Sequence, residues 1–438
     1  MTKRSSRGAL WLLAMSWISW GRARAQEREV ALDDVLAFAE AHAPLMVEAR
    51  ARLEEGEAAR IGASPLLTSG LSVTVGAGPR FQEDGQGDVD FIAALSQSIE
   101  VAGERGTRLD AADRLASQRD AELEAVRWQV HRQIHLAYHH GIHDRARVES
   151  EARWIALGEE VLRIATERAA AGEGPPVERV IAQAELARAR QRQLVALAGY
   201  RQAVLTLAEV SGWDPQSPPA PVGQLHAPDS VPEDAQLLEI ALAGQPLLRA
   251  AAAAVATARA NLAREDRGAL PALDLGLQFS REGSAGSPAN YIGILFVGVS
   301  LPVWQQNTRA RAAAEAALSI AEAQEAALRA AIQARVLRAA STVRLSAERL
   351  RIYEQDVVPG FETALSGLSQ AYQVGEIDLA MLSAGRQTFL AMQVEALAAY
   401  TEYHDALAEL ETELGTEIDA EEHAPSLESA SPSPTGAQ

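Results

Sequence analysis

The apolar and polar positions change their spacing several times along the chain. The spacing of apolar residues predicts helices over residues 30–62 and 234–267. Glycine and proline residues directly after both stretches are expected to end these helices. The spacing then changes to a period of two over residues 70–101 and 272–303, which predicts strands. A loop rich in turn residues divides each of these stretches, so each predicts a β-hairpin with strands of about ten residues. The alternation is clearest where an apolar row, Leu273, Leu275, Leu277 and Phe279, alternates with Asp274, Gly276, Gln278 and Ser280.

Two much longer helices are expected after the hairpins. Residues 104–170 contain no proline, and residues 306–373 contain a single proline, Pro359. At 1.5 Å per residue each uninterrupted helix would reach roughly 100 Å. A spacing of seven residues, typical of coiled coils, separates Val336, Val343, Leu350 and Val357. We therefore expect these helices to pack against neighbours along their length.

The order of elements is predicted to occur twice, at an offset of about 202–206 residues. Leu36–Ala39 followed by Pro44 reappears as Leu238–Ala241 followed by Pro246. Each long helix is followed by a tight turn at a glycine and then by a returning helix. The returning helices are expected over residues 177–211 and 378–414.

This pattern predicts a definite organisation of the chain. The expected segments are a signal peptide over residues 1–25, a first repeat over 26–211 with its β-hairpin over 70–101, a Pro-rich linker over 212–233, a second repeat over 234–415 with its β-hairpin over 272–303, and a disordered acidic tail over 416–438.

The first 25 residues have the features of a secretory signal. Lys3, Arg4 and Arg7 supply a positive charge, residues 10–18 an apolar stretch, and Ala23-Arg24-Ala25 a cleavage site. No later stretch of roughly 20 apolar residues is expected to hold the chain in the inner membrane. The chain has no cysteine, which excludes disulfides, cysteine ligands and nucleophiles, and a lipid anchor on a cysteine after the cleavage site.

The net charge is strongly negative. It is −19 for the whole chain. The first 25 residues hold five basic residues and no acidic ones, so the remaining 35 basic and 59 acidic residues leave a charge of about −24. Such a charge argues against nucleic acid as a partner. The negative charge indicates a surface or lumen that attracts cations. The alternative is that it serves only to keep the protein soluble.

Four strands in one chain cannot close a barrel. Strands of about ten residues cross a bilayer when tilted, but an open sheet edge in lipid leaves backbone groups without hydrogen bonds. Either several chains combine their strands in a membrane, or the hairpins lie in water. The uniformly apolar face of the hairpins favours the membrane.

The order of elements resembles the TolC-like outer-membrane efflux family over about residues 30–415. Two local patterns are similar to its CzcC-type heavy-metal cation-efflux branch. Gln97–Arg105, which reads QSIEVAGER, is similar to the branch's run Q-x-I-E-L-G-G-K-R. Val299–Val303 followed by Asn307 is similar to its V-S-L-P run followed by an asparagine. The chain departs from the branch in Ala102, which replaces the first glycine, and in Trp304-Gln305-Gln306, where the family often has an aromatic residue, Asp and Arg.

The resemblance implies a fold and a function. The fold is mainly α with a small transmembrane β part: a homotrimer whose four strands per chain make a twelve-stranded β-barrel in outer-membrane lipid, continued across the periplasm by a long α-helical coiled-coil barrel. The function is that of a passive exit duct for heavy-metal cations, without cofactors or catalysis. Its partners are a periplasmic adaptor protein and an inner-membrane pump of the resistance-nodulation-division type.

The resemblance also suggests site residues at the helix turns. Gly172, Glu173, Val374, Gly375 and Glu376 correspond to periplasmic tips that dock the adaptor. Tyr372 matches a tip tyrosine of the family, and Glu178 matches an acidic position that narrows the closed channel entrance. The alternative for Glu178 is a solvated residue on the outer face. Ile377 stands where the family has a basic partner near the tyrosine, a departure that bears on the closed-state ion pair.

A row of histidines lies outside this resemblance. His131, His135, His139 and His143 recur at every fourth position, and His140 is adjacent. On a helix, imidazoles four residues apart share a face and can bind one divalent ion. We expect either a low-affinity site of the Zn²⁺ or Ni²⁺ type or an ordinary polar helix face.

Two other functions stay open on the sequence. The same duct can carry drugs or other small toxic organic molecules instead of metal ions. A soluble periplasmic coiled-coil scaffold, with hairpins that never meet lipid, is the alternative from another class. An enzyme is not expected, because the sequence shows no Ser, His and Asp constellation and no phosphate-binding loop, and no acid/base constellation supports catalysis by the histidine row.

Overall fold

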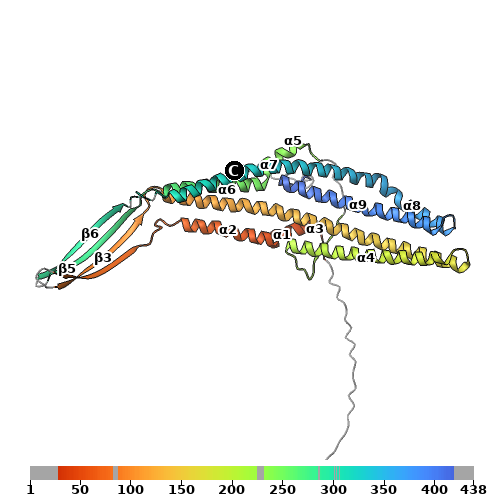
Figure 1. Cartoon of the computed structure of the whole chain (residues 1–438), viewed down its shortest axis with the longest axis horizontal. Helices are drawn as coiled ribbons and strands as arrows, with labels where there is room; N and C mark the ends of the chain where they lie inside the picture. Colours follow the sequence, from red (N-terminus) through yellow and green to blue (C-terminus); the bar gives the residue numbers. More distant parts are fainter. Residues whose placement is uncertain are drawn as a thin grey trace, which may run out of the picture.

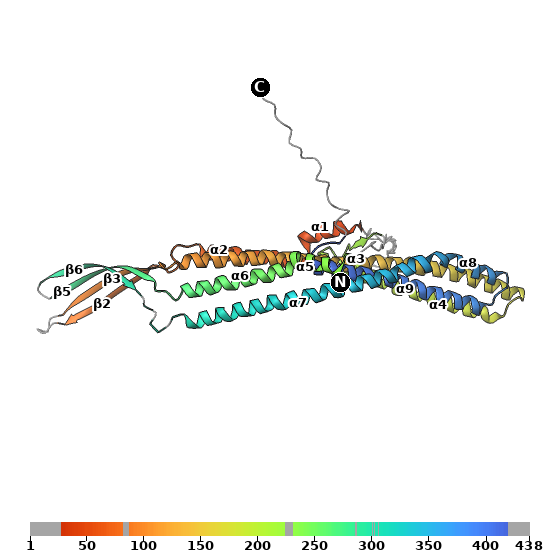
Figure 2. The same cartoon turned by 90° about the horizontal axis from the view of Figure 1, so that it is seen from above.

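The molecule is elongated, with a β-sheet at one end and two helical turns at the other (Figure 1) (Figure 2). The computed structural model describes residues 28–81, 87–223, 231–284, 287–299, 301, 303–304 and 306–418. The expected signal peptide and the tail from residue 419 onward lie outside the described residues.

One antiparallel sheet contains both hairpins. Its strands are β2 (Ser72–Phe81), β3 (Gly87–Ile99), β5 (Leu273–Ser284) and β6 (Ser287–Val299), in the order β2-β3-β5-β6. The two hairpins therefore lie side by side, joined through β3 and β5. Strands β2 and β6 form the two edges of the described sheet.

The two faces of the sheet differ in polarity, as the period of two predicts. A cross-strand row of Val73, Leu95, Leu277 and Leu295 runs over one face. These side chains are 42–78% exposed. The neighbouring row on the opposite face is more polar, with Thr74, Ala94, Gln278 and Ile294. The chain thus presents an exposed apolar face across all four strands.

The residues of the two family-like motifs hold the hairpins to the helices. Glu100 accepts a hydrogen bond from Arg108, whose other guanidinium nitrogens donate to the carbonyls of Ala63 and Pro65 at 3.1 and 2.9 Å. Asn307 Nδ2 donates to the Glu265 carbonyl at 2.9 Å. Each motif therefore ties the start of a long helix to the end of the helix before the sheet.

The first long helix forms as expected. It is α3 (Glu104–Ala171), 68 residues or roughly 100 Å long, and α4 (Pro176–Ser211) returns along it (Figure 1). Helix α2 (Pro44–Ala63) packs on its other end. A Cβ on Gly56 of α2 would lie only 2.8 Å from Cα of Ala116, so these two helices require a residue without a side chain at this point.

The second long helix is interrupted, so the expectation of an unbroken helix over 306–373 is wrong. The structure has α7 (Thr308–Ile352), a π-helical turn over Tyr353–Val357, and α8 (Val358–Gln373), before α9 (Leu379–Leu414) returns. Pro359 lacks a backbone N–H, and its ring collides with a carbonyl of the preceding turn in regular α-helix. The π-turn directly before it provides an altered hydrogen-bond pattern.

The coiled-coil spacing in α7 marks buried positions. Val336, Val343 and Leu350 are fully buried. They belong to a core that includes Leu237, Tyr403 and Leu410, from α5 and α9. Packing between helices, rather than local propensity, therefore holds this long helix in place.

The helices expected over 30–62 and 234–267 are each two helices, which corrects the prediction. The first stretch contains α1 (Leu32–His42) and α2, and the second contains α5 (Asp234–Gly244) and α6 (Pro246–Arg267). Ala43 and Gln245 precede the prolines and have ψ values of 132° and 118°. The ring of a following proline disfavours α-helical geometry at such residues.

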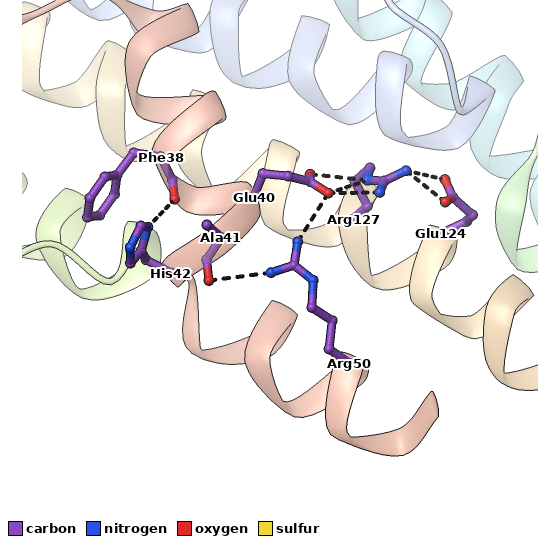
Figure 3. A network of polar contacts seen from close by, with 7 residues as sticks. All are labelled: Phe38, Glu40, Ala41, His42, Arg50, Glu124 and Arg127. Carbon is purple, nitrogen blue, oxygen red and sulfur yellow. Dashed lines mark hydrogen bonds and ion pairs between the residues drawn. The ribbon is translucent and has the colours of Figure 1, made fainter. Parts of the chain in front are cut away.

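A polar network holds α1 and α2 against α3 (Figure 3). Arg127 of α3 donates to Glu40 of α1 at 2.8 Å and to Glu124 at 2.7 Å. Arg50 of α2 lies near the same Glu40 carboxylate, at 3.5 Å, and donates to the Ala41 carbonyl at 3.4 Å. Ionic contacts among α1, α2 and α3 thus fix the position of α1 relative to α2 across the helix break at Pro44.

The predicted linker over 212–233 contains an ordered strand. Within it, β4 (Pro219–Pro221) is buried and pairs in parallel with β1 (Arg28–Val30). The Tyr138 hydroxyl of α3 donates to the carbonyls of Val30 and Val222. This pairing fastens the linker to the middle of α3.

One helical stretch has the length and composition of a membrane span. It covers Asp234–Arg267, contrary to the expectation that no later stretch would qualify, and a third of its apolar window is buried. The stretch is divided at Gln245, and α6 packs against α3 and α7. These features fit an alanine-rich packing helix as well as they fit a span.

Candidate functional site

Two exposed turns form the end of the molecule opposite the sheet (Figure 1). Gly172 and Gly375 have φ values of +75° and +82°, which favour glycine. In both turns the N–H of the next residue bonds back to the last helical turn: Glu173 N to Arg168 O and Glu376 N to Ala371 O, each at 2.9 Å. Both helices therefore end in the same Schellman arrangement.

The structure brings Tyr372 and Glu178 together between these turns. Tyr372 is fully buried at the end of α8, and its hydroxyl donates to Glu178 Oε2 of α4 at 3.0 Å. Its ring packs in a small apolar core that also contains Val161, Ile164, Ala165, Ala182, Leu379 and Leu382. One side chain thus joins the α3–α4 hairpin to the α8–α9 hairpin.

A basic partner for the tyrosine is present, although the sequence analysis did not find it. Arg168 of α3 donates through Nη1 to the Tyr372 carbonyl at 2.9 Å, and its guanidinium carbon lies 5.0 Å from the centre of the ring. Ile377, where the family has its basic residue, packs against the same apolar core. Arg168 precedes Tyr372 by 204 residues, so no local pattern could connect them.

The environment of the pair keeps Tyr372 neutral. Burial, and then the hydrogen bond to the Glu178 carboxylate, raise the pKa of Tyr372 to about 12. The tyrosine is therefore a hydrogen-bond donor throughout the physiological range. Glu178 is only 9% exposed, so in this chain the alternative of a solvated outer-face residue is wrong.

The five tip residues named from the sequence remain accessible. Gly172, Glu173, Val374, Gly375 and Glu376 are all exposed, with Val374 at 64%. Two glutamates and one apolar side chain thus project from turns that are fixed by backbone hydrogen bonds.

The histidine row divides into separate contacts. His131 and His135 stack at 4.1 Å between ring centres, whereas His139 stacks at 4.1 Å on His404 of α9. His143 lies 3.2 Å from Asp144. A site with all four imidazoles is therefore not formed.

His131 and His135 instead converge with a residue from the other half of the chain. Their ring nitrogens and a carboxylate oxygen of Glu411 in α9 all lie within 4.8 Å of one another. Glu411 is distant in sequence, and nothing in the spacing of α3 pointed to it.

Burial makes these imidazoles neutral. It lowers the pKa of His131 to about 4, and the pKa values of His135 and His139 to about 3. His140 behaves differently, because its hydrogen bond to Asp405 at 3.0 Å raises its pKa. Neutral imidazole is the form that binds metal ions.

Known proteins share this architecture. The family model described as outer membrane efflux protein matches residues 35–213 and 237–416. The cobalt-zinc-cadmium resistance protein CzcC of Cupriavidus metallidurans is 24% identical over 324 residues, which cover 74% of this chain and 76% of that protein.

Two solved structures are similar in fold. The outer-membrane channel OprN has a TM-score of 0.72 at 17% identity, covering 88% of this chain and 89% of its own. CusC, whose structures concern transmembrane channel formation, has a TM-score of 0.70 at 13% identity. The match covers 88% of this chain and 92% of the CusC chain.

Proposed function

Because the chain belongs to the outer membrane efflux protein family, we propose that it is the exit duct of a tripartite efflux system of the resistance-nodulation-division type. The family and its structural neighbours are channel proteins, not enzymes. The duct acts passively: it encloses a path from the periplasm through the outer membrane, and the pump supplies the energy.

The sheet is the observation that carries this proposal. Its apolar row of Val73, Leu95, Leu277 and Leu295 is exposed on the single chain. Its edges, β2 and β6, have no further strand beside them in the described residues. Lipid would cover the apolar face, and strands from other copies would satisfy the edges. Three chains with four strands each make a closed twelve-stranded barrel.

The opposite end of the molecule is the proposed docking end. The exposed residues Glu173, Val374 and Glu376 project from the two turns and contact a periplasmic adaptor, which links the duct to the inner-membrane pump. Gly172 and Gly375 set the shape of these turns through their positive φ values. Each trimer would offer six tips of two kinds.

Glu178 and Tyr372 form the proposed entrance. Their hydrogen bond and the contact with Arg168 hold the two helical hairpins of one chain together at the tip. Release of this contact would let one hairpin move away from the other and widen the path. Once the contact is released, three copies of Glu178 turned toward the axis would favour cations over anions.

The proposed cargo is heavy-metal cations. The supporting observations are the likeness to CzcC, named for cobalt, zinc and cadmium resistance, and the negative charge of the chain. Drugs and other small organic molecules are the second candidate, because cargo specificity is expected to reside largely in the pump and the adaptor. A soluble periplasmic scaffold is disfavoured by the exposed apolar face.

Growth and cell fractionation test these proposals separately. A deletion strain should lose tolerance to at least one of Co²⁺, Zn²⁺, Cd²⁺, Cu⁺ and Ni²⁺, and plasmid-borne wild-type protein should restore it. Unchanged tolerance to all five ions with lost tolerance to dyes would favour organic cargo. Release of the protein by osmotic shock, instead of recovery with the outer membrane, would contradict the duct itself.

A further inference from the structure

The cluster of His131, His135 and Glu411 lies in the middle of the helical body, far from the tips and the sheet. His131 is 27 residues into α3, about 40 Å from its start at 1.5 Å per residue. The two imidazoles project from successive turns of α3, and Glu411 reaches them from the last turns of α9. The cluster therefore connects the first half of the chain to the second.

The imidazoles of the cluster are largely withdrawn from water, and one nitrogen of each ring has no hydrogen-bond partner among the described residues. The His131 side chain is 12% exposed, and Glu411 is 4% exposed. Within the described residues, Nε2 of His131 and Nε2 of His135 are buried without a hydrogen-bond partner. Buried nitrogens of this kind cost free energy unless something binds them.

One further acidic group lies close to this position. Glu417 Oε1, just beyond the end of α9, is 3.7 Å from His131 Nε2, too far for a hydrogen bond. The side chain of Glu417 is half exposed, so it can move. Glu411 is held in place through Oε1, which accepts from the Ile418 N–H at 3.3 Å.

We propose that His131, His135 and Glu411 bind a divalent cation of the Zn²⁺ type, with Glu417 within reach as a fourth ligand. Two imidazole nitrogens and a carboxylate are an established donor set for Zn²⁺. Bond lengths near 2.0–2.1 Å require ligand atoms about 3.4 Å apart. The ligand atoms now lie within 4.8 Å of one another, so binding requires them to move closer and the stacked rings of His131 and His135 to turn until both point at the ion.

The other histidines of the row are not ligands of the proposed site. His139 is stacked on His404, His140 is hydrogen-bonded to Asp405, and His143 lies beside Asp144. Each of these contacts directs an imidazole away from the ligand cluster or gives it another partner. The proposed site is therefore made by contact between α3 and α9 and not by the spacing within α3.

The proposed cation has a structural role that does not depend on the cargo. It would join α3 to the C-terminal end of α9, where the buried residues of the two halves meet. A ligand that binds only the folded chain raises its thermal stability in proportion to the logarithm of the free ligand concentration. The site would thus make the stability of the helical body depend on zinc.

Calorimetry on the purified full-length protein in detergent, first treated with a chelator, tests the proposal. Titration with ZnSO₄ should show one saturable site per chain. His135→Gln and Glu411→Gln should each weaken binding at least tenfold, whereas His143→Gln should leave it unchanged. His139→Gln should also bind like the wild type, because His139 is outside the site.

A spectrum of the wild-type protein decides the question even if a variant fails to fold. Added Co²⁺ should give the visible absorption of a cation bound by nitrogen and oxygen in a low-symmetry site, and Zn²⁺ should remove it. Absence of that spectrum together with absence of saturable heat would overturn the proposal. Equal Zn²⁺ affinity of the wild type and the folded His135→Gln and Glu411→Gln variants would overturn it as well.

Discussion

The hydroxyl of Tyr372 donates a hydrogen bond to Glu178 Oε2 at 3.0 Å and joins the two helical hairpins at the tip of the molecule. The two residues belong to different halves of the chain, and both are buried. Arg168 holds the tyrosine from its other side, through the backbone carbonyl and the ring. The tip therefore has one specific polar contact that can be removed without disturbing the turns.

Replacing Tyr372 with phenylalanine should loosen the tip. The change leaves the ring in its apolar core but removes the donor to a buried carboxylate, a loss of roughly 1–3 kcal/mol. Amide hydrogen exchange at the start of α4 and the end of α8 should become roughly 10-fold to 100-fold faster.

Tyr400→Phe provides the matched control. Tyr400 also donates to a glutamate, Glu354 Oε1 at 2.6 Å, but this pair is exposed and away from the tip. It should leave exchange at the tip unchanged. Equal exchange rates at the tip in Tyr372→Phe and the wild type would show that the hydrogen bond does not hold the hairpins.

Alkaline titration should show the buried tyrosine directly. The pKa of Tyr372 is raised from 10.0 to about 12, so its contribution to stability is fully present below pH 10 and is lost as the pH rises through 12. Lys3 is the only lysine of the chain, which leaves tyrosines as the main side chains titrating in this range. The difference in phenolate absorbance between the wild type and Tyr372→Phe should have its midpoint near 12. A midpoint near 10, the value of a solvated tyrosine, would contradict the buried geometry.

Mild acid should destabilise the helical body through its buried histidines. The folded-state pKa values of His131, His135 and His139 are about 4, 3 and 3. Because the unfolded chain takes up protons first, their contribution is fully present above pH 6.5 and falls as the pH drops toward those values. The loss is up to roughly 1.4 kcal/mol per histidine for each pH unit below 6.5.

Denaturant unfolding at pH 7 and pH 5, in a buffer containing a chelator, measures this loss. A variant with glutamine at all three positions should show a much smaller difference between the two pH values. His140, whose pKa is raised by Asp405, instead adds stability as the pH falls. This residue is kept in the variant, so its contribution is the same in both proteins. If the variant and the wild type lost equal stability, the three imidazoles would not be buried in the neutral form.

An arginine on the apolar face of the sheet should hinder insertion. Leu295 is 78% exposed in the apolar row, and an arginine facing the middle of the bilayer costs roughly 2–4 kcal/mol. Leu295→Arg should therefore reduce the amount of protein recovered in the outer membrane. Gln278→Arg, on the opposite face and paired with the neighbouring Ile294, should insert normally. Equal recovery of both variants would mean that this face does not meet lipid.

The long elements could be predicted from the sequence because their signals are local. The period of two located the strands, and the absence of proline and the glycine at residue 172 bounded α3 almost to the residue. The breaks before Pro44 and Pro246, and the π-turn before Pro359, were missed although the prolines were visible. Apolar residues continue across each of these breaks, so the pattern reads as continuous helix.

The sites could be predicted only in part, because their partners come from distant segments. Tyr372 and Glu178 were each selected through a family resemblance but not as partners of one another, and Arg168 was missed. Spacing along α3 selected His131 and His135 but also His139 and His143, and it could not reveal Glu411 on α9. Contacts between the two halves depend on helix packing, which spacing along one helix does not report.

The mass of the complex extracted from outer membranes tests the central claim most directly. Full-length protein should be recovered with the outer membrane, resist release by osmotic shock, and run in detergent as three chains held together. In the proposed trimer, three chains would supply the twelve strands that close the sheet carrying Val73, Leu95, Leu277 and Leu295. A single chain recovered in the soluble periplasmic fraction would contradict the proposed duct.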